Sequence, residues 1–138
     1  MISKPSDHPK LQNNKIGILL INLGTPINTN VKSIRLYLKE FLSDRRVIDV
    51  PRVLWWLILN LIILNTRPKK TREAYKKIWI QNDPDGSPLR KITRLQSEKL
   101  SNKFKNSDII VDYAMRYGIP AIKTKLDELK KKGCDKII

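Results

Sequence analysis

The side chains that most often perform acid–base or nucleophilic chemistry are scarce in this chain. Histidine and cysteine each occur once among its 138 residues, as His8 and Cys134. A single histidine in a polar N-terminal stretch argues against a nucleophilic triad, and one cysteine with one histidine argues against a zinc site. Asp83 and Asp85 lie among turn residues rather than as a catalytic carboxylate pair. The lone cysteine allows no intrachain disulfide, which favours a reducing compartment.

Three turns that combine glycine with proline are better candidates for a ligand site. "NLGTP" (22–26) and "MRYGIP" (115–120) each follow an apolar run, and "GSPL" (86–89) precedes a predicted helix. In open parallel sheets, ligands bind at the carboxyl ends of the strands. Gly86 and Ser87 offer hydrogen-bond donors near a helix start, which suits a carboxylate or a phosphate. Because turns need glycine and proline in any case, each turn taken alone is equally well explained as structure.

The elements that would position these turns alternate between strand and helix. Continuous apolar runs predict fully buried strands at 15–22 and 108–115, and 134–138 begins a third. Apolar residues at helical spacing predict helices at 31–42, 69–79, 89–104 and 121–132. Thr29 or Asn30 is expected to cap the first helix and Gly133 to end the last. Asn65 to Pro68 is expected to end the apolar run before the basic helix at 69–79.

This order of elements predicts an α/β domain with a parallel sheet and crossover helices. We expect one domain over 15–138, preceded by a flexible arm at 1–14. The last residues, Lys136 to Ile138, are the start of an apolar strand. We therefore expect the domain to be incomplete at its C-terminus, as one part of a longer protein.

The stretch "PRVLWWLILNLIILNTRPKK" (51–70) is apolar at its centre and basic at both ends. Its apolar run, 53–64, is shorter than the roughly 20 residues that a membrane helix needs. Buried core and an interfacial apolar surface both remain open, since the run is apolar on nearly every side. Trp55 and Trp56 are typical of an interface, where the flanking basic residues would face lipid head groups.

The net charge is +15 at pH 7, so the electrostatic field of the chain favours anionic partners. A background of solvated lysines explains this charge equally well. A nucleic-acid-binding module is one alternative, because the basic segment 67–105 contains Tyr75 and Trp79, and aromatic side chains can stack on bases. Their spacing of four residues is more typical of core packing on a helix. A membrane-surface module without catalysis is a further alternative.

Five blocks, taken together, resemble the N-terminal part of bacterial ferrochelatases. They are "GILLINLGTP", "YLKEFLSDRRVIDVPRVLWWLILNLIIL", "RPKKTREAYKKIW", "GSPL" and "MRYGIP". The resemblance runs from about residue 15 to the end of the chain. It implies a doubly wound, three-layer, chelatase-like α/β domain. It also implies insertion of ferrous iron into protoporphyrin IX, the last step of protohaem synthesis, with porphyrin and Fe²⁺ as substrates and no permanently bound cofactor.

The resemblance further implies roles for individual residues. The segment 41–64 would form an apolar lip over the porphyrin cleft. In the family this lip is often associated with the membrane. The resemblance therefore implies a cytoplasmic enzyme with peripheral contact at the inner membrane surface. The implied lip side chains are Leu54, Trp55, Trp56, Leu57 and Ile58. The resemblance implies six porphyrin-binding residues. Leu23 would face the macrocycle, and Arg116 and Tyr117 would lie beside the face where the metal enters. The propionates would be held by Lys69, Tyr75 and Ser87.

The chain departs from the family pattern at the catalytic residues. The family's catalytic histidine follows a later strand, in a hydrophobic–His–Gly context, and its partner glutamate comes later still. Neither region occurs in these 138 residues, and His8 precedes the first strand. We therefore assign no catalytic residue and no metal ligand, and expect this chain alone not to chelate iron. We expect no nucleic-acid partner; the oligomeric state is left open.

Overall fold

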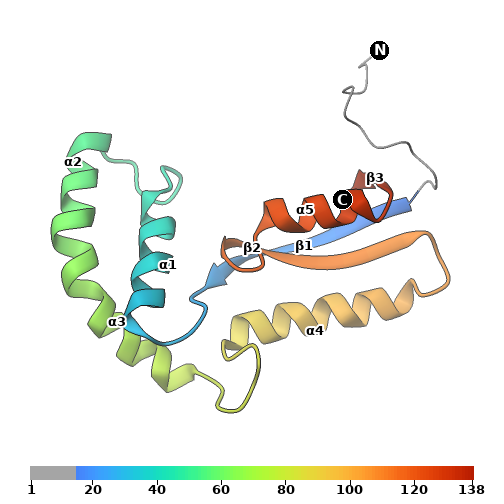
Figure 1. The fold of residues 1–138 in the computed structure, drawn as a ribbon, viewed down its shortest axis with the longest axis horizontal. Helices are drawn as coiled ribbons and strands as arrows, with labels where there is room; N and C mark the ends of the chain where they lie inside the picture. The colour runs from blue at the N-terminus through green and yellow to red at the C-terminus, as the bar shows by residue number, and fades with distance from the viewer. Residues whose placement is uncertain (1–14) are drawn as a thin grey trace.

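The computed structural model describes residues 15–138 (Figure 1). The strands are β1 (Lys15–Thr25), β2 (Ile109–Gly118) and β3 (Cys134–Ile137). The helices are α1 (Val31–Ser43), α2 (Arg52–Leu57), the π-helical segment η1 (Ile58–Ile63), α3 (Leu64–Ile78), α4 (Pro88–Lys103) and α5 (Ile122–Lys131). The predicted arm at 1–14, which contains His8, lies outside the described residues.

The sheet has three parallel strands in the order β2-β1-β3. Figure 1 shows α4 and α5 on opposite sides of the strands. On the α4 side, Nδ2 of Asn22 donates to Oγ1 of Thr93 at 3.0 Å. On the α5 side, Gly17 lies so close to Leu129 that an added Cβ would be 3.2 Å from that side chain. This arrangement confirms the predicted α/β fold with helices on both faces of a parallel sheet.

A helical hairpin stands beyond the carboxyl ends of the strands (Figure 1). Its first arm is α1, and its second is a continuous helical run of α2, η1 and α3. The arms share a core of Ile34, Leu38, Leu42, Leu59 and Leu64. The sheet has a separate core with α5, formed by Leu19, Ala114, Leu129 and Cys134. The hairpin thus has a core of its own and lies next to the carboxyl ends of the strands.

The apolar run ends before Asn65 as predicted, but the prediction that the basic helix begins only at residue 69 is wrong, because α3 begins at Leu64 and continues through Pro68. Proline removes a backbone donor and usually kinks a helix. Here side chains bond to the carbonyl groups of the preceding turns. Asn65 Nδ2 donates to Leu61 O at 2.9 Å, and Thr66 Oγ1 donates to Ile62 O at 2.8 Å. Pro68 itself is buried, so packing favours the continuous helix.

The prediction that the strands are fully buried is also wrong. Ile21 and Leu23 on β1 are 57% and 51% exposed. They lie on the α5 face of the sheet but beyond the residues that α5 covers, since Gly17 and Leu19 on the same face are buried. Both strands also run further than predicted, to Thr25 and Gly118. The strand ends therefore offer an uncovered apolar surface.

The caps follow the sequence prediction more closely. Asn30 caps α1, because its Oδ1 accepts from the backbone N–H of Ser33 at 2.7 Å. Gly133 adopts a φ of +87° after α5, a left-handed conformation that favours glycine. In α4, by contrast, the residues that are buried are Arg90, Thr93 and Ser97, while the apolar side chain of Ile92 is exposed.

Candidate functional site

The carboxyl ends of β1 and β2 approach each other at a glycine. Gly24 pairs with Tyr117 in the parallel register and has a φ of +113°. A Cβ at this position would overlap the carbonyl oxygen of Tyr117. Only glycine permits both the backbone conformation and this close approach. The predicted turn "NLGTP" is thus the end of β1, and its Gly24 is required for the packing of the two strands.

Arg116 and Tyr117 converge on one carboxylate oxygen. Arg116 Nη2 and the Tyr117 hydroxyl donate to Oδ2 of Asp44 at 2.8 and 3.0 Å. The backbone N–H of Arg46 donates to the other oxygen, Oδ1, at 2.9 Å. These bonds stabilise the ionised carboxylate and lower the pKa of Asp44 to about 2. The bond from the Arg46 amide has the largest effect, and the bond from Arg116 the next largest. Asp44 is therefore a permanent anion at neutral pH.

An aromatic cluster supports this polar group from α1. Phe41 packs edge to face on Tyr117, with ring centroids 5.1 Å apart, and lies parallel to Tyr37 at 6.0 Å. The Tyr37 hydroxyl donates to the carbonyl oxygen of Gly24 at 3.3 Å. Burial raises the pKa of Tyr37 far above its ordinary value, so this hydroxyl remains protonated. The cluster holds α1 against the strand ends.

A buried arginine holds the segment after β1. Arg90 Nη2 donates to Pro26 O at 2.8 Å, and its Nη1 donates to Asp85 O at 3.1 Å. The Asp85 side chain accepts from Arg94 Nε at 2.7 Å. The start of α4 is thereby joined to the strand end, and Ser87, the N-cap residue of α4, is buried beside it.

Residues 15–138 match the family model described as ferrochelatase. The chain belongs to the ferrochelatase family. It is 51% identical over 135 residues to the ferrochelatase of Allorhizobium ampelinum, an alignment that covers 97% of this chain and 39% of that protein. It is 48% identical to the ferrochelatase of Rhizobium etli, over 98% of this chain and 39% of that protein. It is 52% identical to the ferrochelatase of a Bradyrhizobium species, over 94% of this chain and 37% of that protein. The chain thus spans about 39% of the length of the curated ferrochelatases that it matches.

Three of the residues implied by the ferrochelatase resemblance lie together in the structure. In the parallel register of β1 and β2, Leu23 lies beside Arg116, because the flanking residues pair as Asn22 with Met115 and Gly24 with Tyr117. The side chains of Leu23 and Arg116 therefore leave the sheet on the same face. Both side chains are exposed. Tyr117 is buried but reaches Asp44 beside Arg116.

The residues implied to hold propionates are less closely grouped. Tyr75 packs edge to face on Trp79, at 6.4 Å between centroids, and Gly86 lies so close to the Trp79 indole that a Cβ would overlap it. Trp79 therefore connects Tyr75 with the loop that ends at Ser87. Lys69 is exposed on α3 and forms no ion pair with another residue of the described range.

The implied lip side chains lie on α2 and at the start of η1, where the apolar surface is largely uncovered, although Leu42, Leu59 and Leu64 of the segment 41–64 belong to the hairpin core. Leu54, Trp56 and Leu57 are exposed, whereas Trp55 and Ile58 are half-buried. Trp55 Nε1 donates to Leu42 O at 2.7 Å, which ties its indole to α1. Within residues 15–138, no helix combines the length and the apolar character needed to cross a bilayer.

Sequence reasoning missed three residues that hold the site together. Asp44 lies in the segment 43–51, for which the sequence predicts a charged loop or a short extended piece, and Tyr37 and Glu40 lie in a helix predicted only from its apolar spacing. Glu40 Oε2 accepts from the backbone N–H of Gly118 at 2.9 Å. The spacing of Tyr37, Glu40 and Asp44 by three and four residues, on one side of a helix, is the signal that was available.

The described residues contain no cluster of three or more histidine, cysteine, aspartate or glutamate side chains that could hold a metal ion. The polar groups gathered at the strand ends are instead two donors, Arg116 and Tyr117, already paired with one anion, Asp44. Such an arrangement can orient a ligand and contact its acid groups. It does not offer a free base.

Proposed function

We propose that this chain serves protohaem biosynthesis as a ferrochelatase protein that binds protoporphyrin IX for insertion of Fe²⁺. The observation that carries the proposal is the position of exposed Leu23 beside Arg116 on the same face of the sheet, at the strand ends. A porphyrin-binding site needs an apolar surface with cations at its edge, and Leu23 and Arg116 supply these two features.

The chemistry of the porphyrin matches this surface. The macrocycle is a flat apolar disc, and two propionate groups leave it on one side. Leu23 and Ile21 offer an uncovered apolar surface, and Arg116 lies at its border. We infer that the macrocycle lies on Leu23, with Arg116 and Tyr117 held at its edge by Asp44.

We assign the propionates to Lys69, Tyr75 and Ser87, as the family resemblance implies. Burial raises the pKa of Tyr75, so its hydroxyl remains a neutral donor near pH 7. The ammonium group of Lys69 is exposed and free of ion pairs with described residues. An unpaired cation and a neutral donor both suit a carboxylate ligand.

We further propose that the 138-residue chain does not chelate iron by itself. Insertion of Fe²⁺ releases two pyrrole protons, and a base with a pKa near neutral accepts protons best at neutral pH. Residues 15–138 contain no histidine. Asp44 has a pKa of about 2 and is a poor proton acceptor.

We place the protein in the cytoplasm, with peripheral contact of the exposed lip residues at the inner membrane surface. Nucleic-acid binding is the weaker candidate. Tyr75 and Trp79 pack edge to face on each other, and Tyr75 also packs on Tyr37 at 6.3 Å. Rings that are used in this way are not free to stack on bases.

The propionate assignment is tested by comparing protoporphyrin with its dimethyl ester, which has no acid groups. Soret absorbance titrations should show weaker binding of the ester. Lys69→Gln should weaken binding of the free acid by about fivefold, consistent with one exposed ion pair, and leave ester binding unchanged. Lys70→Gln, at the next exposed position, is the matched control. Equal effects of both variants would refute the role of Lys69.

A further inference from the structure

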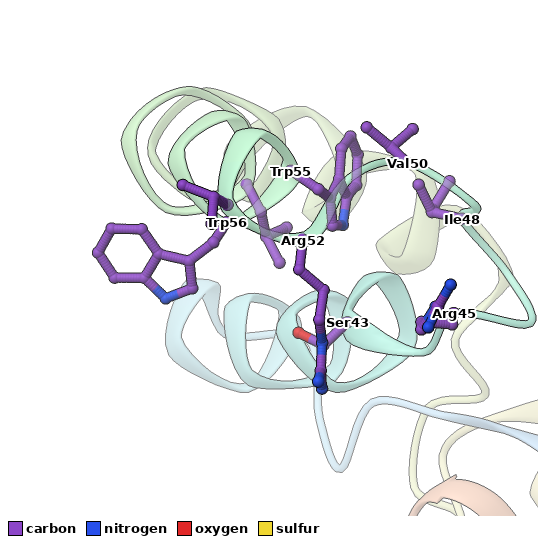
Figure 2. Close-up of a pocket in the computed structure, with 9 residues that line it drawn as sticks. Ser43, Arg45, Ile48, Val50, Arg52, Trp55 and Trp56 are labelled. Atoms are coloured by element: carbon purple, nitrogen blue, oxygen red, sulfur yellow. The ribbon is translucent and has the colours of Figure 1, made fainter.

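A polar groove of about 540 Å³ lies between α4 and β2, on the side of β2 that faces away from β1. It is separate from the apolar cavity at the lip, which Figure 2 shows around Trp55, Val50 and Ile48. The size of the groove lies within the range of ordinary small-ligand sites. Its lining residues come from α4 and β2 alone and are Arg94, Ser97, Glu98, Ser101, Asn102, Val111, Asp112 and Tyr113.

The groove and the proposed porphyrin surface lie on opposite faces of the sheet. Side chains alternate along a strand, so Tyr113 and Arg116, which are an odd number of positions apart on β2, point to opposite sides. Arg116 lies with Leu23 on the face of α5, whereas Tyr113 lies on the face that α4 covers. A ligand in the groove is therefore independent of the proposed function.

The charged side chains of the groove are already paired. Arg94 Nε donates to Asp85 Oδ2 at 2.7 Å, and its Nη1 donates to Glu98 Oε1 at 2.6 Å. Asp112 Oδ2 accepts from Nζ of Lys125 on α5 at 3.1 Å. A charged ligand would compete with these oppositely charged partners, so the groove favours a neutral one.

The hydroxyl groups of the groove, by contrast, are available to a ligand. Thr93 Oγ1 donates to Leu89 O at 2.7 Å, but Ser97 Oγ, one turn later, forms no hydrogen bond with another residue of the range 15–138. Ser97 is only 5% exposed, so its hydroxyl is buried at the groove without a partner from that range. The Tyr113 hydroxyl also lacks a partner among residues 15–138, and burial raises its pKa, so it remains a neutral donor.

A peptide strand does not fit beside β2 at this groove. The backbone N–H of Tyr113 donates to Oδ1 of Asp112 at 2.8 Å, and the N–H of Met115 donates to Pro120 O at 2.7 Å. An added strand would need these donors, because main-chain hydrogen bonds supply the affinity of strand addition. The groove is therefore better suited to a small molecule than to an extended peptide.

We propose that this groove binds a neutral polyhydroxylated ring, the pyranose or furanose of a sugar. Its hydroxyl groups bond to Ser97, Tyr113 and the carboxamide of Asn102, and its C–H face lies on Val111. Sugar hydroxyls both donate and accept, which matches these side chains, and the carboxylate of Asp112 retains lone pairs beyond its present bonds. A neutral sugar also gains nothing from the net charge of +15, so the hydroxyl groups alone select it.

The test titrates the ¹⁵N-labelled 138-residue chain with the methyl glycosides of glucose, mannose, galactose and ribose and follows amide chemical shifts. At least one glycoside should bind saturably with a dissociation constant below about 10 mM, and tetrahydropyran-2-methanol, which has one hydroxyl, at least about tenfold more weakly. Ser97→Ala and Tyr113→Phe should each weaken the best glycoside by about fivefold, the effect of one hydrogen bond. Ser107→Ala is the matched control, because it removes an exposed serine hydroxyl outside the groove and should have no effect.

A further variant fills the groove. Asn102 is exposed on α4, so Asn102→Trp should fold normally and abolish glycoside binding. Glucose 6-phosphate should bind no more tightly than methyl glucoside if hydroxyl groups select the ligand. The proposal is overturned by the absence of saturable binding with all four glycosides, by equal losses in Ser97→Ala and Ser107→Ala, by full affinity in Asn102→Trp, or by tighter binding of the phosphate ester.

Discussion

Arg116 on β2 and Asp44 at the end of α1 form an ion pair with an Nη2 to Oδ2 distance of 2.8 Å, although 72 positions separate them in the sequence. The Tyr117 hydroxyl donates to the same oxygen. This contact joins the helical hairpin to the sheet at the proposed porphyrin surface. The backbone N–H of Arg46, followed by Arg116 and Tyr117, lowers the pKa of Asp44 and keeps its carboxylate ionised.

Asp44→Asn should lower the free energy of unfolding at pH 7, since Arg116 and Tyr117 then lose their anionic acceptor. The folded-state pKa of Asp44 is about 2, below the ordinary value of 3.8. Its contribution is therefore present above about pH 4 and lost as the pH falls toward 2. Urea unfolding at pH 7, 4 and 2 should show a difference between wild type and variant that shrinks over this range. Asp49→Asn is the control at an exposed carboxylate, and a difference independent of pH would contradict the assignment.

Gly24→Ala should destabilise the protein by more than about 2 kcal/mol, because both the positive φ and the overlap with Tyr117 O oppose a side chain. Gly133→Ala is the matched control. It has a positive φ, but no atom lies within 4 Å of the added Cβ, so only the conformational cost of about 1 kcal/mol remains. Chemical denaturation measures both, and equal losses would mean that the close approach of the strands has no energetic importance.

Trp55→Phe should cost about 1 kcal/mol of stability, the usual net value of one hydrogen bond, because Leu42 O loses its donor. Trp56→Phe should be neutral within about 0.5 kcal/mol, since that side chain is mostly exposed. Thermal unfolding of the two variants provides the comparison. A larger loss for Trp56→Phe would show that the lip packs differently.

Arg90→Met should destabilise the protein by about 3 kcal/mol, because it leaves the carbonyl oxygens of Pro26 and Asp85 without their charged donor. It should also weaken protoporphyrin binding, since the segment after β1 is no longer held in place. Lys91→Met, which breaks only the partly exposed pair with Asp83, should cost less than about 1 kcal/mol and leave porphyrin binding unchanged. Full porphyrin affinity in folded Arg90→Met would separate this arginine from the site.

The helices, the strands and their order could be predicted from the sequence, because the spacing of apolar residues and the residue types of turns are local properties of the chain. The strand that begins at Lys15 and the cap at Asn30 are examples. The continuation of α3 through Pro68 could not be predicted, because packing of buried Leu64 and Pro68 outweighs the local preference of proline. The exposure of Leu23 likewise depends on how far α5 extends over the sheet.

The site was predicted only in part for the same reason. Arg116 and Tyr117 were identified through the family resemblance, which carries their sequence context. Their partner Asp44 was not, because the spacing of Tyr37, Glu40 and Asp44 shows a shared side of the helix but not a contact with a residue 72 positions away. Gly24 was predicted as a turn residue, whereas the structure shows that it permits close contact with Tyr117.

We propose that porphyrin rests on the uncovered apolar surface at the ends of β1 and β2. A Soret titration of protoporphyrin IX with wild type, Leu23→Asp and Ile92→Asp tests this claim. Ile92 is as exposed as Leu23 but lies on α4. We predict saturable binding to wild type and Ile92→Asp, and at least about tenfold weaker binding to Leu23→Asp. No saturable Soret shift with wild type, or equal affinity of the two variants, would contradict the claim.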